Sequence, residues 1–320
     1  MTTLLPPRRI LGSTGLEVSS ICIGTSPLAS MSLLYGYSVS EGRAVETVES
    51  VFNSPFNFID TSNDYGADGA AERRIGLALR SHGGLPSGMV LATKVDPDPA
   101  TGDFSGRRVR RSLEESMERL GLDHIQLLHL HDPERMSFAD AIAPGGPVEA
   151  LVQLKDEGLV DHLGVAGGSV ALMQQYVDTG AFEVVLTHNR YTLLDRSASR
   201  LFRDAHERGM GVLNAAPYGG GMLAKGPDRQ QRYAYGLGDE SIGSTAAAME
   251  SVLSRAGVPL AAAALQFSLR APFVHSTVVG VSTPERVRQT AELATIDIPE
   301  ELWDELEQLT PRSDLWLDPA

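Results

Sequence analysis

The sequence places proton-transferring side chains at the ends of three apolar runs. Asp60, Lys94 and His131 each close such a run, and Tyr65 lies in the loop just after Asp60. An unperturbed phenol titrates at about 10, too high for easy proton donation at neutral pH, but a neighbouring ammonium group favours phenolate. If the four side chains converge, we expect Lys94 to lower the pKa of Tyr65 and Asp60 to hold Lys94 charged. Tyr65 could then protonate a carbonyl oxygen that receives hydride, or accept the proton in reverse, with His131 hydrogen-bonded to the same oxygen.

Each of these residues also has a structural explanation. Asp60 could cap the next turn, and the segment 63–66 is ordinary turn sequence. His131, taken alone, would more often be a satisfied structural histidine than a catalyst. Lys94 is harder to explain in this way, because a lysine that ends an apolar strand needs a partner to tolerate burial. The chemical interpretation therefore depends on the whole set.

Eight apolar runs alternate with helical patterns along the chain, which is typical of parallel strands joined by crossover helices. We expect strands at 18–24, 57–60, 89–94, 124–131, 162–166, 184–188, 211–215 and 276–280. Eight strands of this kind predict an α/β fold, a (β/α)8 TIM barrel that forms a single domain over residues 1–320. Functional groups in such barrels gather at the carboxyl ends of the strands. Alternation along each strand should turn Asp60, Lys94 and His131 toward the barrel interior.

The segments between the strands carry helix signals. Ser40, Ser105 and Thr283 are expected N-caps, because their hydroxyls can accept hydrogen bonds from free first-turn amides. Further helices are expected at 245–256 and 300–309. The segment 219–244 is rich in glycine and polar residues, which predicts a long loop after the seventh strand. Loops of this length are often active-site covers.

Composition limits the partners that we expect. A net charge of −14 disfavours nucleic acid, and the arginines at 107, 108, 110 and 111 are followed by glutamates, which predicts a solvated helix with paired charges. Cys22 is the single cysteine, as is usual in a reducing compartment. The first ten residues fit neither a signal peptide nor a membrane span, so we expect a cytoplasmic protein without a membrane partner.

With these residues placed, nearly the whole sequence resembles the aldo-keto reductase superfamily. The resemblance rests on four fragments in order, Phe58-Ile59-Asp60-Thr61, Asp64-Tyr65-Gly66, Ala92-Thr93-Lys94 and Arg119-Leu120-Gly121 leading to His131. It implies that Asp60, Tyr65, Lys94 and His131 are a catalytic tetrad. It also implies a nicotinamide cofactor, NAD or NADP, that lies extended at the barrel mouth without a Gly-rich Rossmann fingerprint.

The resemblance assigns cofactor contacts less completely. Gly164-Val165-Ala166-Gly167 replaces the Gly-Val-Ser-Asn of many relatives, so Asn189 or His188 is expected to supply the missing carboxamide contact. Gly280 stands where NADP-preferring relatives often carry a lysine, although Arg286 is retained, and this difference favours NAD or dual use. The expected cofactor-binding residues are Gly24, Asp60, Asn189, Ala216, Tyr218, Gly219, Gly220, Gly280 and Arg286.

Three further segments resemble one branch of this family, the branch that contains aldose 1-dehydrogenases and pyridoxal 4-dehydrogenase. They are Tyr35-Gly36-Tyr37, His131-Asp132-Pro133 and Asn189-Arg190-Tyr191. This narrower resemblance implies a small-molecule carbonyl, sugar or alcohol substrate, and in one direction the oxidation of a cyclic hemiacetal to a lactone. Tyr35, Tyr37 and Trp316 are expected as apolar substrate walls, or else as packing aromatics.

Two other functional classes stay open at this point. A metal-dependent hydrolase could use His129, His131 and His188, but residues 276–280 supply no acidic ligand, so we expect no metal. A regulatory protein that binds the cofactor with little turnover is the second alternative, because a fold does not dictate function. The sequence leaves the oligomeric state open.

Overall fold

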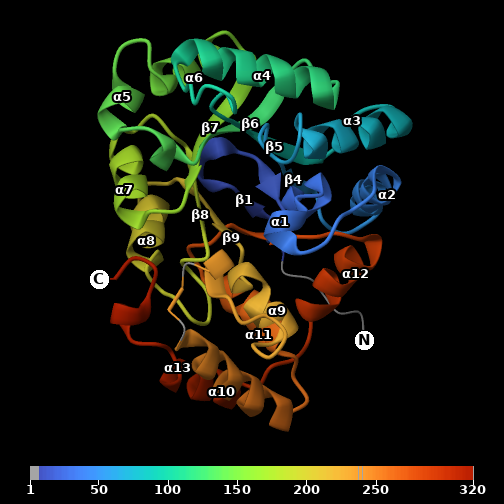
Figure 1. The fold of residues 1–320 in the computed structure, drawn as a ribbon, viewed down its shortest axis with the longest axis vertical. Coiled ribbons are helices and arrows are strands. Elements are labelled where there is room, and N and C mark those ends of the chain that lie inside the picture. The colour runs from blue at the N-terminus through green and yellow to red at the C-terminus, as the bar shows by residue number, and fades with distance from the viewer. Residues whose placement is uncertain (1–6, 237, 240, 320) are drawn as a thin grey trace.

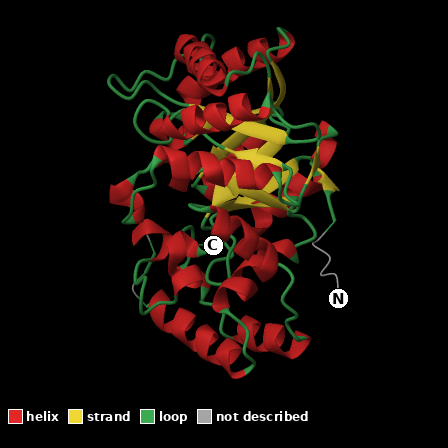
Figure 2. Ribbon diagram, turned by 90° about the vertical axis from the view of Figure 1, so that its right-hand side faces the viewer, coloured by secondary structure: helices red, strands yellow, loops and turns green. Residues whose placement is uncertain are grey.

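The computed structural model describes residues 7–236, 238–239 and 241–319. Eight parallel strands close into a barrel in the order β10-β3-β4-β5-β6-β7-β8-β9, which confirms the predicted TIM barrel. The strands are β3 (Ile21–Gly24), β4 (Phe58–Asp60), β5 (Val90–Val95), β6 (Ile125–His131), β7 (Val160–Gly167), β8 (Val184–His188), β9 (Gly211–Ala215) and β10 (Ser276–Gly280). Figure 2 shows this barrel in yellow with helices packed around it.

Each barrel strand from β3 to β9 is followed by one or more helices that return the chain to the start of the next strand, and α12 (Pro284–Leu293) and α13 (Glu300–Gln308) follow β10 (Figure 1). The longer ones are α2 (Glu41–Phe52), α3 (Ala70–His82), α4 (Gly106–Leu120), α6 (Pro147–Asp156), α7 (Val170–Asp178), α8 (Ser199–Glu207), α11 (Leu260–Leu269) and α12 (Pro284–Leu293). The hydroxyls of Ser40, Ser105 and Thr283 accept hydrogen bonds from first-turn amides of α2, α4 and α12, as predicted. Outside the barrel, α10 (Ile242–Arg255) packs on α13 (Glu300–Gln308).

The first predicted strand, at 18–24, is wrong in its amino-terminal part. Residues 9–10 and 17–18 form an antiparallel pair, β1 (Arg9–Ile10) with β2 (Glu17–Val18), and the barrel strand begins only at Ile21. The break falls at Ser19, whose amide donates to the side chain of Asn57 and whose hydroxyl donates to the carbonyl of Ile21. Leu11 and Val18 then pack with the apolar side chains inside the barrel.

The segment 219–244 is more ordered than the predicted loop. It contains the short helical turns η4 (Gly219–Gly221), α9 (Met222–Lys225) and η5 (Tyr233–Gly236). Tyr233 is 2% exposed, and its hydroxyl donates to the carbonyl of Asn189 just after β8. A buried tyrosine therefore fixes this segment against the barrel mouth.

The short helices α1 (Ser32–Tyr35) and α5 (Phe138–Ile142) follow β3 and β6.

The barrel interior confirms the predicted alternation. Phe58, Val90, Ala92 and Leu127 belong to one buried apolar cluster inside the barrel. Asp60 and Lys94 lie two residues beyond Phe58 and Ala92, and His131 lies four residues beyond Leu127, so each belongs to the same face of its strand. Among the described residues, no single helix is long and apolar enough to span a membrane, and α10 with α11 passes such a test only as a pair bent by 100°.

Candidate active site

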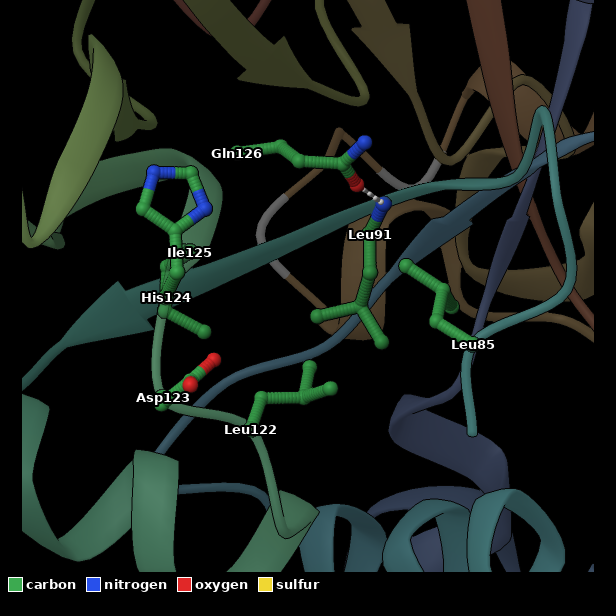
Figure 3. Close-up of a pocket in the computed structure, with 7 residues that line it drawn as sticks. All are labelled: Leu85, Leu91, Leu122, Asp123, His124, Ile125 and Gln126. Carbon is green, nitrogen blue, oxygen red and sulfur yellow. Dashed lines mark hydrogen bonds between the residues drawn. The ribbon is translucent and has the colours of Figure 1, made fainter. Parts of the chain in front are cut away.

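A cleft of about 490 Å³ opens at the carboxyl ends of the barrel strands, where the chemistry was expected. Asp60, Tyr65, Lys94 and His131 all contribute to its wall. A smaller cavity of about 220 Å³ lies at the opposite ends of β5 and β6, and Figure 3 shows the Gln126 side chain accepting a hydrogen bond there from the amide of Leu91. None of the predicted site residues lines that smaller cavity, so we place the site in the larger cleft.

A buried ion pair forms the floor of the cleft. Lys94 and Asp60 are 1% and 3% exposed, and the ammonium nitrogen lies 2.7 and 2.8 Å from the two carboxylate oxygens. It also donates to the carbonyl of Thr61 at 2.6 Å. The three hydrogens of the ammonium group thus have three acceptors, which is the full compensation that a buried charge requires.

Tyr65 lies over this pair, with the Lys94 nitrogen 4.8 Å from the centre of its ring. The expected lowering of the Tyr65 pKa is wrong. Burial raises the pKa of Tyr65 well above its ordinary value, and the carboxylates of Asp60, Asp132 and Asp96 raise it further. The physical reason is that burial removes the water that would solvate a phenolate, and the nearby carboxylates, Asp60 first, disfavour that charge further. Tyr65 is therefore a phenol, not a phenolate, at neutral pH.

His131 meets Tyr65 edge to face, with ring centres 5.8 Å apart. Its Nδ1 lies 2.6 Å from Oδ1 of Asp96 and 3.0 Å from the hydroxyl of Ser62. Burial opposes a charge on this ring, but Asp96 and Asp132 outweigh burial and raise the pKa of His131 above its ordinary value. Asp96 is fully buried directly after β5, and sequence reasoning missed it. The only available signal was an acid placed two residues after the strand-ending Lys94.

Arg108 corrects the interpretation of the basic segment as a solvated helix. The guanidinium is 8% exposed, binds both carboxylate oxygens of Glu115 at 2.9 and 3.0 Å, and donates to the carbonyl of Asp96 at 3.1 Å. It also donates to the side chain of Asn63, in the loop that carries Tyr65. Arg111 remains exposed and paired, as predicted. Arg108 turns inward because the first turn of α4 packs against the loop after β5.

Most of the predicted cofactor residues line the cleft. Those that line it are Gly24, Asp60, Ala216, Tyr218, Gly220, Gly280 and Arg286. The exposed cation Lys225 and the side chain of Gln230 line the same cleft and were missed, because they lie in the segment predicted only as a long loop.

Asn189 and Gly219 are not brought to the cleft surface. A Cβ on Gly219 would overlap the Tyr233 ring, so this glycine packs against Tyr233. Asn189 is fully buried at a positive φ of 62°, with its amide nitrogen 3.0 Å from Nδ1 of His188, and its Oδ1 has no partner. His188, the alternative to Asn189, does line the cleft.

Tyr35 and Tyr37 also line the cleft, with ring centres 5.8 Å apart. Trp316 is not part of the cleft; its indole N–H donates to the carbonyl of Pro311 at 3.1 Å, which holds the ring against the C-terminal segment. Two missed cleft residues are Asp132 and Arg135, which are joined by a 3.2 Å ion pair.

Among the described residues, no group of three or more histidine, cysteine, aspartate or glutamate side chains is arranged to hold a metal ion. Two of the three histidines of the hydrolase alternative, His131 and His129, have different hydrogen-bonding surroundings. His131 is engaged by Asp96, whereas both ring nitrogens of His129 are buried without a partner.

Comparison with known proteins gives a consistent picture. Residues 20–311 match the model of the aldo/keto reductase family. The chain is 31% identical over 294 residues to D-threo-aldose 1-dehydrogenase of a Pseudomonas species, covering 84% of this chain and 88% of that protein. It is 33% identical to L-galactose dehydrogenase of Arabidopsis thaliana, over 94% of this chain and 93% of the relative. It is 30% identical to pyridoxal 4-dehydrogenase of Microbacterium luteolum, over 93% and 96%.

The fold also matches a solved structure. An aldo-keto reductase of Bacillus halodurans superposes with a TM-score of 0.78 at 23% identity, covering 95% of this chain and 96% of that one.

Proposed function

The chain belongs to the aldo/keto reductase family and is a nicotinamide-dependent oxidoreductase that interconverts a carbonyl and an alcohol, and from this premise we propose that its substrate is a small sugar or a similar cyclic hemiacetal. In the oxidative direction the product would be a lactone. Relatives named as aldose, galactose and pyridoxal dehydrogenases support this substrate class.

One observation carries the proposed mechanism. A fully compensated Asp60–Lys94 pair lies under Tyr65, and Tyr65 and His131 border the same 490 Å³ cleft. A bound nicotinamide would supply or accept hydride at the substrate carbon. Tyr65 would donate its phenolic hydrogen to the substrate oxygen in reduction, since its raised pKa keeps it protonated. His131 would bind the same oxygen, and Asp60 and Lys94 would hold the loop of Tyr65 from below.

The residues on the cleft wall fit an extended dinucleotide. Lys225 offers a cation for the pyrophosphate, Arg286 offers one for the additional phosphate of NADP, and the glycines at 220 and 221 leave room for close backbone approach. The unpartnered Oδ1 of Asn189, next to His188, is a polar atom that a carboxamide could satisfy after a small side-chain movement.

A substrate screen tests the proposed function directly. Purified protein would be assayed with aldoses, pyridoxal and small aldehydes, with NAD and NADP and in both directions, by the absorbance of the reduced cofactor. We expect turnover of at least one cyclic sugar. Cofactor binding without turnover of any compound would instead support the regulatory alternative.

We propose that NAD is accepted at least as well as NADP, because Gly280 offers no side chain for the additional phosphate of NADP. Arg286 is exposed and is then the residue that would bind this phosphate. Replacing Arg286 with alanine should raise the Kd of NADP about tenfold or more, the usual effect of losing one charge-assisted hydrogen bond. The Kd of NAD should change by less than about threefold, because NAD carries no phosphate monoester for Arg286 to bind. Quenching of intrinsic fluorescence measures both constants.

Arg288→Ala is the matched control for this prediction. Arg288 is exposed on the same helix but does not line the cleft, so neither Kd should change. Equal weakening of both cofactors by Arg286→Ala would contradict the assignment of Arg286 to the additional phosphate.

A further inference from the structure

We propose that Asp96 is a positioning residue for His131, which keeps the ring hydrogen on Nδ1 and leaves Nε2 as the nitrogen that meets the reacting oxygen. This inference deepens the proposed function and rests on it, because it assumes that His131 binds the substrate oxygen. It concerns a residue outside the tetrad, fully buried behind the cleft wall.

The hydrogen-bond pattern around Nδ1 determines which ring nitrogen carries hydrogen. Nδ1 of His131 lies 2.6 Å from Oδ1 of Asp96 and 3.0 Å from Oγ of Ser62. The single hydroxyl hydrogen of Ser62 is directed to Oδ2 of Asp96, 2.6 Å away, so it is not available for the ring. The carboxylate can only accept. Nδ1 must therefore donate, and in the neutral ring Nε2 carries a lone pair.

This tautomer changes what His131 can bind. A neutral ring accepts a hydrogen bond at Nε2, which suits the hydroxyl of an alcohol or hemiacetal. A protonated ring donates at Nε2, which suits a carbonyl oxygen. Asp96 thus links the charge of His131 to the oxidation state of the bound substrate, because the same nitrogen accepts from one state and donates to the other.

The charged surroundings favour the protonated form without fixing it. Asp96 is held ionised, since His131 and Ser62 lower its pKa although burial opposes this. Asp132 lies 3.7 Å from Nε2, but it is also paired with Arg135. Three charged groups act directly on the His131 ring, namely Asp96 after β5, Asp132 after β6 and Lys94 in β5. The other ionisable groups nearby are His129 in β6 and His188 in β8, together with Tyr65 after β4 and Arg135 after β6, which line the cleft with His131.

Asp96 is held by several hydrogen bonds of its own, so it also has a structural role, which is distinct from its effect on His131. Its Oδ2 accepts from the amide of Asp64, its own amide donates to Ser112 of α4, and its carbonyl accepts from Arg108. The same carboxylate therefore connects His131 to the loop of Tyr65. A purely structural role would alter stability without moving the titration of His131.

The first experiment uses nitrogen-15 NMR of the histidine rings, with His131 assigned by the signals that are lost in His131→Gln. In the unmodified protein we expect hydrogen on Nδ1 of the neutral ring. In Asp96→Asn the titration midpoint of His131 should fall by about one pH unit or more, the size of effect expected for losing an adjacent opposite charge. Hydrogen on Nε2 in the unmodified protein would overturn the proposal, and this result does not depend on the folding of Asp96→Asn.

Asp98→Asn is the matched control. It makes the same chemical change two residues further along the loop, where the carboxylate caps Thr101 and does not touch His131. The His131 midpoint should move by less than about 0.3 pH unit, because a partly exposed distant charge is screened. Equal displacement of the midpoint in Asp96→Asn and Asp98→Asn would contradict a specific role of Asp96.

The second experiment follows kcat/KM against pH in both directions with the best substrate of the screen. Reduction should fall and oxidation should rise with pH through a shared midpoint, and both profiles should move to lower pH in Asp96→Asn. At a pH above the original midpoint, kcat/KM for reduction should be about tenfold lower if the midpoint has moved down by one pH unit. Slower turnover with an unchanged midpoint would assign Asp96 a structural role only. Absence of all turnover would defeat the proposed function, while the NMR titration would still report on Asp96.

Discussion

Tyr65→Phe is expected to lower kcat by about 10²-fold or more, which is the usual contribution of a positioned proton donor. The Kd of the nicotinamide nucleotide should stay within about twofold, because the proposed role of the hydroxyl is proton transfer to the substrate oxygen and the aromatic ring is retained. Tyr65 is the one group in the proposed mechanism that both carries a hydroxyl proton and has its ring over the Lys94 ammonium group, 4.8 Å from the ring centre. Steady-state kinetics and fluorescence titration of the cofactor measure the two quantities separately.

Tyr176→Phe is the matched control for this variant. Tyr176 is fully buried outside the cleft, and its hydroxyl has no hydrogen-bond partner. Removing that hydroxyl should leave kcat and stability unchanged. If Tyr65→Phe retained the kcat of the unmodified enzyme, Tyr65 could not be the proton donor, and His131 would be the next residue to examine.

Lys94→Met should have the largest effect on stability. It leaves the Asp60 carboxylate, only 3% exposed, without its main partner. Breaking a buried ion pair in this way costs about 3–5 kcal/mol of unfolding free energy. We also expect kcat to fall about 10²-fold or more, because the support and electrostatic surroundings of Tyr65 are lost together. Urea unfolding and steady-state kinetics measure the two losses.

The double variant Asp60→Asn with Lys94→Met separates these losses. Neither buried charge is then left alone, so the protein should be more stable than with Lys94→Met, although kcat should remain low. Lys155→Met is the control for removing a lysine, because its ion pair with Glu183 is partly exposed and worth at most about 1 kcal/mol. A double variant no more stable than Lys94→Met would show that charge compensation is not what Lys94 provides.

The candidate tetrad illustrates how far local sequence could predict the site. Asp60, Lys94 and His131 lie at or next to the carboxyl ends of neighbouring strands, and the register of these strands with strand alternation places the three side chains on one face. The closure of the barrel brings those strand ends to one mouth. Their juxtaposition therefore followed from the strand pattern alone, whereas their roles in the reaction remain proposals.

The ordered segment after β9 shows where local patterns were insufficient. Its glycines and polar residues predicted a loop. In the structure the Tyr233 hydroxyl donates to the carbonyl of Asn189, and Lys225 and Gln230 of the same segment line the cleft. Such a contact depends on residues far apart in sequence. The same is true of Trp316, which was expected at the substrate and lies against Pro311 instead.

The sequence by itself determined the strand order, the inward direction of the polar strand ends and the family resemblance, because these depend on periodicity and on short motifs. Only the tertiary structure decided the charge states in the cleft. A pKa is set by the burial of a group and by every charge around it, so burial first, and then Asp60, Asp132 and Asp96, raised the pKa of Tyr65, whereas Lys94 alone would have lowered it. The contact between Asp96 and His131, with Oδ1 2.6 Å from Nδ1, likewise depends on the packing of β5 beside β6.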